Sequence, residues 1–205
     1  MRDKKGMIKF FKKMAILSVT VLIAVTLMLP VFATETKTKH YDLACKRLED
    51  RTPDYRWGGN IEGATSTSRE IYKTIWRRAT GDWGGASITF TYNSSSENSL
   101  DVMYEASSSG YGESHSPPVN GIITYFYAKV NVAEIESYSD NFFRSTANHE
   151  LGHIMGLKHY YGESVIMNTG RNRNSLYIPT SYDCDGVNEA FDAYPDYTGW
   201  LCYGK

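Results

Sequence analysis

Three stretches of the chain repeat apolar residues at the spacing of a helix with one buried face. The first covers residues 67–79, where Thr67 and Glu70 form a capping box at the start. The second runs from about 142 to 155, and the third covers residues 185–194. These segments predict two helices in the body of the chain and one helix near its end.

Other segments alternate apolar and polar residues, as strands with one buried face do. Strands are expected at residues 55–57, 87–92 and 100–104. Residues 107–120 are rich in Ser, Gly and Pro and predict a loop, and the longest strand pattern covers residues 122–132. Because helices and strands are mixed in this order, the sequence predicts an α+β domain.

The first 33 residues are typical of a secretory signal peptide. A basic start precedes an apolar run at residues 15–29, and Val31-Phe32-Ala33 suits a signal peptidase. The run is shorter than the roughly 20 residues that span a bilayer, so cleavage after Ala33 is favoured over an uncleaved anchor. Residues 34–53 predict a flexible start or a short pro-segment. The expected domain covers residues 54–205, with a small C-terminal subdomain from about residue 157.

Removal of this leader changes the charge of the chain. The leader holds six of the 22 Lys and Arg residues and one of the 23 acidic residues, so the remainder has 16 bases, 22 acids and a net charge of −6. The remainder has no basic stripe, which argues against nucleic acid as a partner. It also has no second long apolar run, so we expect a secreted, extracellular chain without membrane attachment, and a monomer.

The three cysteines all lie after the leader. An oxidising compartment favours a disulfide, and Cys184 and Cys202 are the expected pair because both lie near the end of the chain. Cys45 is then expected to be free. Two alternatives are a bond from Cys45 to one of the others and three free thiols.

The segment from residue 149 to residue 159 carries the main chemical signal. His149 and His153 are four residues apart on an expected helix, so both rings leave the same face, roughly 6 Å apart along the axis. That separation suits two ligands of one zinc ion. Glu150 points about 100° around the helix, where a carboxylate can act as a general base towards a zinc-activated water without binding the metal.

A glycine explains how a third histidine reaches the same point. His159 would face elsewhere if the helix continued, but Gly156 can adopt a left-handed conformation and end it. Three protein ligands leave one position for water, which is typical of a catalytic zinc site.

The same residues have simpler interpretations. A lone His-Glu-x-x-His can be a surface pattern, but here five fixed positions match. A zinc that only stabilises a binding protein is less favoured because Glu150 is present. A glutamate third ligand, Glu163 or Glu189, is disfavoured by the combination of Gly156 and His159.

This segment resembles the extended zinc signature of the metzincin metallopeptidases, and the chain is most similar to their matrixin-like branch. The resemblance implies that His149, His153 and His159 hold one catalytic zinc and that Glu150 is the general base. Eight residues after His159, Met167 in Ser-Val-Ile-Met resembles the metzincin Met-turn, which forms an apolar floor beneath the metal.

The resemblance also implies a fold and a substrate. The expected fold is a twisted, mostly parallel sheet with an antiparallel edge strand, two long helices and a small C-terminal subdomain. Residues 122–132 would be the edge strand that pairs with a polypeptide substrate, and residues 168–173 would line the pocket beyond the cut. A calcium site remains open but has no support in the sequence, because the acids that could bind it are scattered: Asp82, Asp101, Glu105 and Asp140.

The sequence therefore predicts a secreted zinc-dependent endopeptidase. The alternative is a secreted, zinc-stabilised binding or toxin-like protein without peptidase activity. Incubation with a protein substrate, with and without a chelator, separates the two.

The leader gives the first testable prediction. The secreted chain should begin at Thr34, because Ala33 occupies the position that signal peptidase reads. N-terminal sequencing of the product from the culture medium measures this. A membrane-bound product that still begins at Met1 would support the anchor instead.

Overall fold

The computed structural model describes residues 43–106, 110–135, 139–162 and 164–193. The predicted signal peptide, residues 34–42 of the predicted flexible start, and Cys202 lie outside these ranges. The described residues form an α+β fold, as the sequence predicts, and their strands make two mixed sheets.

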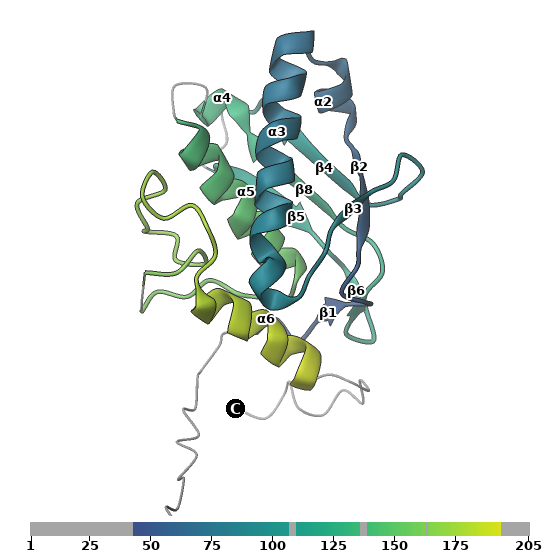
Figure 1. Cartoon of the computed structure of the whole chain (residues 1–205), viewed down its shortest axis with the longest axis vertical. Coiled ribbons are helices and arrows are strands. Elements are labelled where there is room, and N and C mark those ends of the chain that lie inside the picture. Colours follow the sequence, from purple (N-terminus) through teal and green to yellow (C-terminus); the bar gives the residue numbers. More distant parts are fainter. Residues whose placement is uncertain (1–42, 107–109, 136–138, 163, 194–205) are drawn as a thin grey trace, which may run out of the picture. The chain divides into compact units, whose positions relative to one another are not determined.

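The larger sheet has five strands in the order β3-β2-β4-β8-β5 (Figure 1). All neighbours are parallel except β5, which runs antiparallel to β8 at the edge. The strands are β2 (Asp54–Trp57), β3 (Thr91–Tyr92), β4 (Ser99–Met103), β5 (Gly112–His115) and β8 (Tyr127–Asn131). A smaller sheet joins β1 (Arg47–Leu48), β7 (Ile122–Ile123) and β6 (Pro118–Val119).

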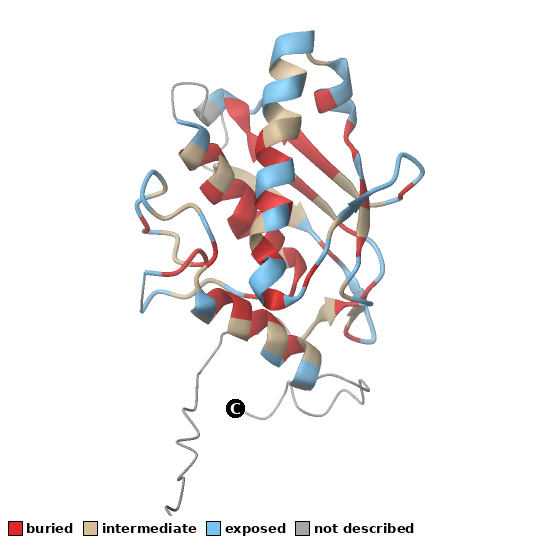
Figure 2. Ribbon diagram, viewed as in Figure 1, coloured by how far each residue is buried: buried red, intermediate tan, exposed pale blue. Residues whose placement is uncertain are grey.

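Two long helices, α3 (Ser66–Asp82) and α5 (Asp140–Ile154), lie side by side on one face of the larger sheet (Figure 1). Their apolar faces and the facing side of the sheet are buried (Figure 2). The remaining helices are α2 (Gly59–Gly63), a 3₁₀ turn at Trp83–Ala86, α4 (Val132–Ile135) and α6 (Ser181–Ala193). No helix of the described residues is both long and apolar enough to cross a membrane.

Two buried carboxylates hold the helices in position. Asp101 in β4 accepts hydrogen bonds from the backbone N–H groups of Asn60 and Ile61, at 3.3 and 2.9 Å, and so caps α2. Asp82 at the end of α3 pairs with Arg144 of α5 and accepts a hydrogen bond from Asn148 Nδ2 at 2.7 Å. Since Asn148 precedes His149, this bond fixes α5 next to its first histidine.

The start of α3 differs from the prediction. The capping residue is Thr65, whose hydroxyl accepts a hydrogen bond from the Ser68 N–H at 3.3 Å, and the helix includes Thr67 and Glu70. The chain offers Thr and Ser at several successive positions, so the capping pattern alone did not identify the correct one.

The edge strand was assigned to the wrong segment. Residues 122–132 are divided between β7 in the small sheet and β8, which lies inside the larger sheet. The edge strand is β5, within the segment 107–120 predicted to be a loop. Its sequence Gly-Glu-Ser-His has no apolar alternation, so the hydrophobic pattern carried no signal for it.

The predicted Cys184–Cys202 disulfide is also wrong. Cys184 is a free, buried thiol. It lies in the first turns of α6 and faces the 3₁₀ turn after α3, where a Cβ on Gly85 would be 3.1 Å from its Sγ. Cys45, expected to be free, is disulfide-bonded. The predicted pairing relied on closeness in sequence, but the helix points the Cys184 side chain into the core.

This arrangement predicts unequal cysteine chemistry. Burial raises the pKa of the Cys184 thiol to about 11, so at pH 8 only about one molecule in a thousand carries the reactive thiolate. Folded protein should therefore leave Cys184 unlabelled by iodoacetamide, and unfolding without reductant should expose it. Mass spectrometry of a non-reduced digest should find Cys45, and not Cys184, in a cross-linked peptide. Rapid labelling of Cys184 in folded protein would contradict its burial.

Candidate metal centre

His149 and His153 leave the same face of α5, as their spacing predicts. Their ring centroids are 4.7 Å apart. His149 is buried, and His153 is partly exposed. The helix therefore presents two imidazoles side by side, one deeper than the other.

Gly156 turns the chain back after α5. Its φ of +97° is in the left-handed region that favours glycine, and the Leu157 N–H donates to Gly152 O at 3.0 Å to close the end of the helix. A side chain would not fit either, since a Cβ at position 156 would lie 2.1 Å from the carbonyl oxygen of Lys46. Glycine is thus required both by conformation and by space.

This reversal brings His159 to the two helical histidines. Its ring centroid lies 5.1 Å from that of His149 and 4.8 Å from that of His153. One nitrogen from each of the three rings lies within 4.8 Å of the others. The structure therefore places all three predicted ligands where they could hold one metal ion.

Backbone carbonyls orient two of the rings. His149 Nδ1 is 2.9 Å from Ile166 O, and His153 Nδ1 is 2.8 Å from Leu157 O. A carbonyl only accepts, so each Nδ1 carries the proton and each Nε2 keeps its lone pair for a metal. His153 Nε2 also lies 3.1 Å from His159 Nε2.

The protonation of the rings suits metal binding. Burial is the main cause that lowers all three pKa values, that of His149 well below its usual value and that of His153 to about 4. The buried guanidinium of Arg171 lowers them further. Neutral imidazole is the form that binds a metal, so the donor set of this cluster fits a cation at neutral pH.

Met167 packs against α5 next to the cluster. A Cβ on Gly152 would lie 2.4 Å from the Met167 sulfur, so this close approach requires glycine in the helix. The turn before Met167 is held by Asp183 of α6, which accepts the Ile166 N–H at 3.0 Å. Met167 is buried, with 2% of its surface exposed.

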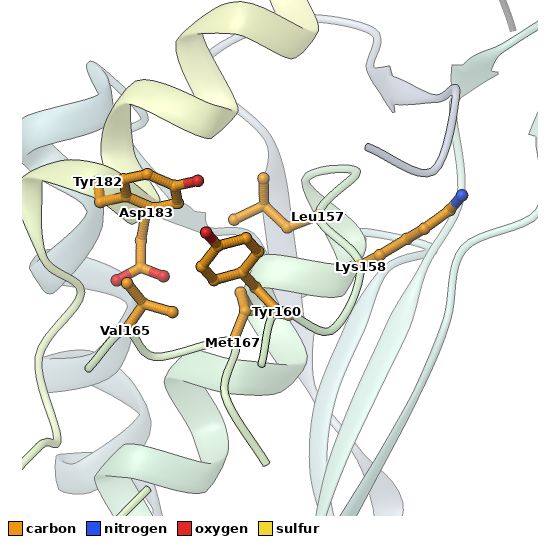
Figure 3. Close-up of a pocket in the computed structure, with 7 residues that line it drawn as sticks. All are labelled: Leu157, Lys158, Tyr160, Val165, Met167, Tyr182 and Asp183. Atoms are coloured by element: carbon orange, nitrogen blue, oxygen red, sulfur yellow. The ribbon is translucent and has the colours of Figure 1, made fainter. Parts of the chain in front are cut away.

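A small cavity lies between this turn and α6. Figure 3 shows Leu157, Tyr160, Val165 and Met167 around it, while the Lys158 side chain extends away from the group. The volume of this cavity, about 20 Å³, suits a single water molecule, so the cavity is too small for a substrate side chain. Its role is in packing.

Glu150 packs against the edge strand and is not one of the three converging ligands. Its side chain is buried at 6% exposure, and Ser114 Oγ donates to its Oε2 at 2.8 Å. A Cβ at Gly112 would lie 2.9 Å from Oε1, so glycine in β5 makes room for the carboxylate. Burial raises the pKa of Glu150 to about 7. The hydrogen bond from Ser114 and the positive charge of Arg171 lower this pKa, but their effect is smaller than that of burial.

Arg171 is a buried cation that the sequence did not single out. Its guanidinium donates to Ser145 Oγ and Ser145 O at 2.9 and 2.8 Å and to Asn168 O at 3.0 Å, and Nη1 lies 3.3 Å from His149 Nδ1. Burial lowers its pKa to about 9. It was expected to line a substrate pocket with its neighbours, but it faces α5. One arginine in a polar loop has no periodicity that would reveal this.

Several other candidates lie elsewhere. Glu189, weighed as a third ligand, is not in the cluster, and Glu163 lies outside the described residues. Two of the scattered acids, Asp82 and Asp101, are used in the helix contacts above. Among the described residues, the three histidines are the group whose atoms converge as metal ligands do, so calcium gains no support.

Comparisons with known proteins add the fold alone. No family model and no curated protein matches this chain. Among solved structures, the chain is similar to the GM1-bound form of the ECX AB5 holotoxin, with a TM-score of 0.50 and 17% identity. The match covers 68% of this chain and 80% of the other chain.

The contacts of Arg171 generate a prediction. Replacing Arg171 with Met removes the donors to Ser145 O and Asn168 O and should cost about 1–3 kcal/mol of unfolding free energy, because buried acceptors lose their partners. It should also weaken zinc binding, since the loop that accepts from His149 loses its tie to α5. Urea unfolding and zinc titration measure the two effects.

Arg171→Lys is the matched control, because it keeps the charge and loses the planar fork of donors. It should recover only part of the stability. An Arg171→Met variant with unchanged stability and zinc affinity would show that these contacts are unimportant.

Proposed function

We propose that this chain is a secreted zinc-dependent endopeptidase of the metzincin type. The observation that carries the proposal is the convergence of His149, His153 and His159, with Glu150 beside them but outside the cluster. A structural metal site has no need of a buried carboxylate next to its ligands. A hydrolase needs both parts.

The donor set favours zinc. Three imidazole nitrogens, two of them with Nδ1 held by backbone carbonyls, are typical of catalytic zinc sites with three protein ligands. When bound, zinc supplies a Lewis acid that makes a water molecule more acidic and a peptide carbonyl more electrophilic. His149 and His153 would hold it from α5, and His159 would hold it from the turn after the helix.

Glu150 is the general base in this proposal. It accepts a proton from the attacking water and passes it to the amine that leaves the cleaved peptide bond. Ser114 donates to one of its oxygens, which leaves Oε1 to take the proton. Burial of the side chain keeps it in one orientation, and Gly112 gives it the room to lie against β5.

The edge strand suits a polypeptide substrate. Strand β5 is the last strand of the larger sheet within the described residues, so its outer side can pair with an extended peptide. Ser114 of this strand contacts the general base. A peptide paired with β5 would therefore run past Glu150 and the histidines. This role replaces the one that residues 122–132 were expected to have.

A second candidate is a secreted, toxin-like binding protein with a structural zinc. It is favoured by one observation, the similarity of fold to a chain of an AB5 holotoxin in its GM1-bound form. Both candidates need the histidine cluster. They differ in whether Glu150 acts as a general base.

Hydrolysis of casein by the zinc-loaded protein separates them. The endopeptidase should release peptides, and a chelator such as 1,10-phenanthroline should stop the release until zinc is added back. Zinc-loaded, folded protein that releases no peptides from casein or from a mixed peptide library would favour the binding protein.

A pair of substitutions tests the roles within the site. Glu150→Gln should keep one zinc per chain but lose at least about 10²-fold in hydrolysis, because Gln cannot accept the proton. His159→Ala should lose zinc itself, because one of the three ligands is gone. Elemental analysis and casein hydrolysis measure the two effects.

Glu113→Gln is a control for the loss of a carboxylate next to the site. Glu113 lies in β5 and pairs with Lys129 at 2.7 Å, outside the metal cluster, so hydrolysis should change little. Near-normal hydrolysis by Glu150→Gln, or full zinc occupancy in His159→Ala, would contradict the assigned roles.

A further inference from the structure

An open cleft of about 490 Å³ adjoins two of the histidines. On one side it is bounded by the N-terminal segment at Lys46 and on another by β5 and the residue after it. The polar side chains that line it are Lys46, Ser114, Ser116, His153, Lys158 and His159. Unlike the small cavity beside Met167, it is large enough for an amino-acid side chain.

The N-terminal wall of the cleft is held firmly in place. Ala44 N–H donates to Gly156 O at 2.7 Å, and Leu43 forms a bridge with Leu157. Cys45 is disulfide-bonded. The backbone beside Lys46 is therefore fixed against the turn that carries His159.

The charge of the cleft is one-sided. Its lining residues include two lysines and no carboxylate. Elsewhere in the described part of the chain, lysines at the edge of the fold are paired: Lys73 with Glu62 and Lys129 with Glu113. Neither Lys46 nor Lys158 has a carboxylate within ion-pair distance among the described residues.

Lys46 is already oriented. Its Nζ donates to Ser116 Oγ at 2.6 Å and to Ser116 O at 3.2 Å, which uses two of three donors. Burial lowers its pKa, with no opposing charge among the causes. Lys158 is exposed, and its side chain leads away from the Met167 cavity (Figure 3). A partly buried ammonium without a counter-charge costs free energy, and an incoming anion would recover some of it.

We propose that this cleft is a subsite for a carboxylate of the peptide substrate, recognised by Lys46 and Lys158. The inference rests on the proposed peptidase function and deepens it, since it gives the enzyme a preference for acidic peptides. The position of His153 and His159 in the same lining places the carboxylate within a few residues of the bond to be cut. Serine hydroxyls at Ser114 and Ser116 add neutral donors.

The carboxylate has two possible sources, an acidic side chain and a free C-terminus. The same cations recognise either one, so peptides must separate them. Four fluorescent peptides of one apolar sequence suffice: one with a central Glu and an amidated end, one with Gln in its place, one with Gln and a free C-terminus, and one with Glu and a free C-terminus.

Binding is measured by fluorescence anisotropy on zinc-loaded Glu150→Gln protein, so that no peptide is cut. A carboxylate in the cleft should lower Kd about five-fold relative to the amidated Gln peptide, the size of a partly exposed ion pair. Lys158→Met and Lys46→Met should each reduce this ratio towards one, and the double variant should abolish it. Salt at 0.5 M should reduce it as well.

Arg78→Met is the matched control, because Arg78 is an exposed cation on α3 outside the cleft. It should leave the ratio unchanged. Circular dichroism shows whether Lys46→Met is folded. If it is not, the Lys158→Met variant and the salt dependence still test whether the cleft recognises a carboxylate. Equal Kd values for all four peptides overturn the proposal, and so does a preference that survives in Lys158→Met.

This outcome is separable from the proposed function. Casein hydrolysis by the unsubstituted protein tests the peptidase, while the anisotropy ratio tests the cleft in a protein that does not cut. If the protein cuts casein but shows no preference for acidic peptides, the proposed function stands and the proposed subsite is wrong.

Discussion

The site depends on the chain reversal at Gly156. A left-handed residue there follows the end of α5 at Ile154 and brings His159 back to the two helical histidines. The same reversal lets the backbone of Lys46 approach where any Cβ would collide. One glycine thus completes the ligand set and seats the N-terminal segment that bounds the cleft. A side chain at position 156 would therefore displace both His159 and the segment at Lys46.

Buried polar side chains hold the segments on either side of Met167 in position. Asp183 holds the turn before Met167 to α6, and Arg171 holds the loop after it to α5. Both side chains are buried, and each hydrogen-bonds to two backbone groups: Asp183 to the N–H groups of Ile166 and Thr180, and Arg171 to the carbonyls of Ser145 and Asn168. Charged hydrogen bonds of this kind are stronger than neutral ones, and they lose much when one partner is removed. The segment whose Ile166 carbonyl orients His149 is therefore held both to α6 and to α5 itself.

The edge strand and the general base are built together. Glu150 can be buried against β5 because Ser114 donates to it and Gly112 leaves space for it. This gives β5 a composition that suits the carboxylate and not the core: glycine, two polar residues and a histidine. The strand that is proposed to bind substrate and the residue proposed to activate water are thus in direct contact. The cationic cleft adjoins the same strand at Ser114, so substrate pairing, proton transfer and charge recognition share one element.

Local sequence determined what depends on short spacing. The four-position spacing of His149 and His153, a glycine before His159 and the apolar periodicity of α3 and α5 were enough to predict both helices, the turn and the convergence of the three rings, because helix geometry is regular. Tertiary structure decided the rest. The edge strand β5 has no apolar pattern, since its partner is a carboxylate. Arg171 and Lys46 have roles only through residues far away in the sequence. The cysteine pairing failed because the direction in which α6 turns Cys184 is set by packing against the 3₁₀ turn, and sequence distance carries no information about that.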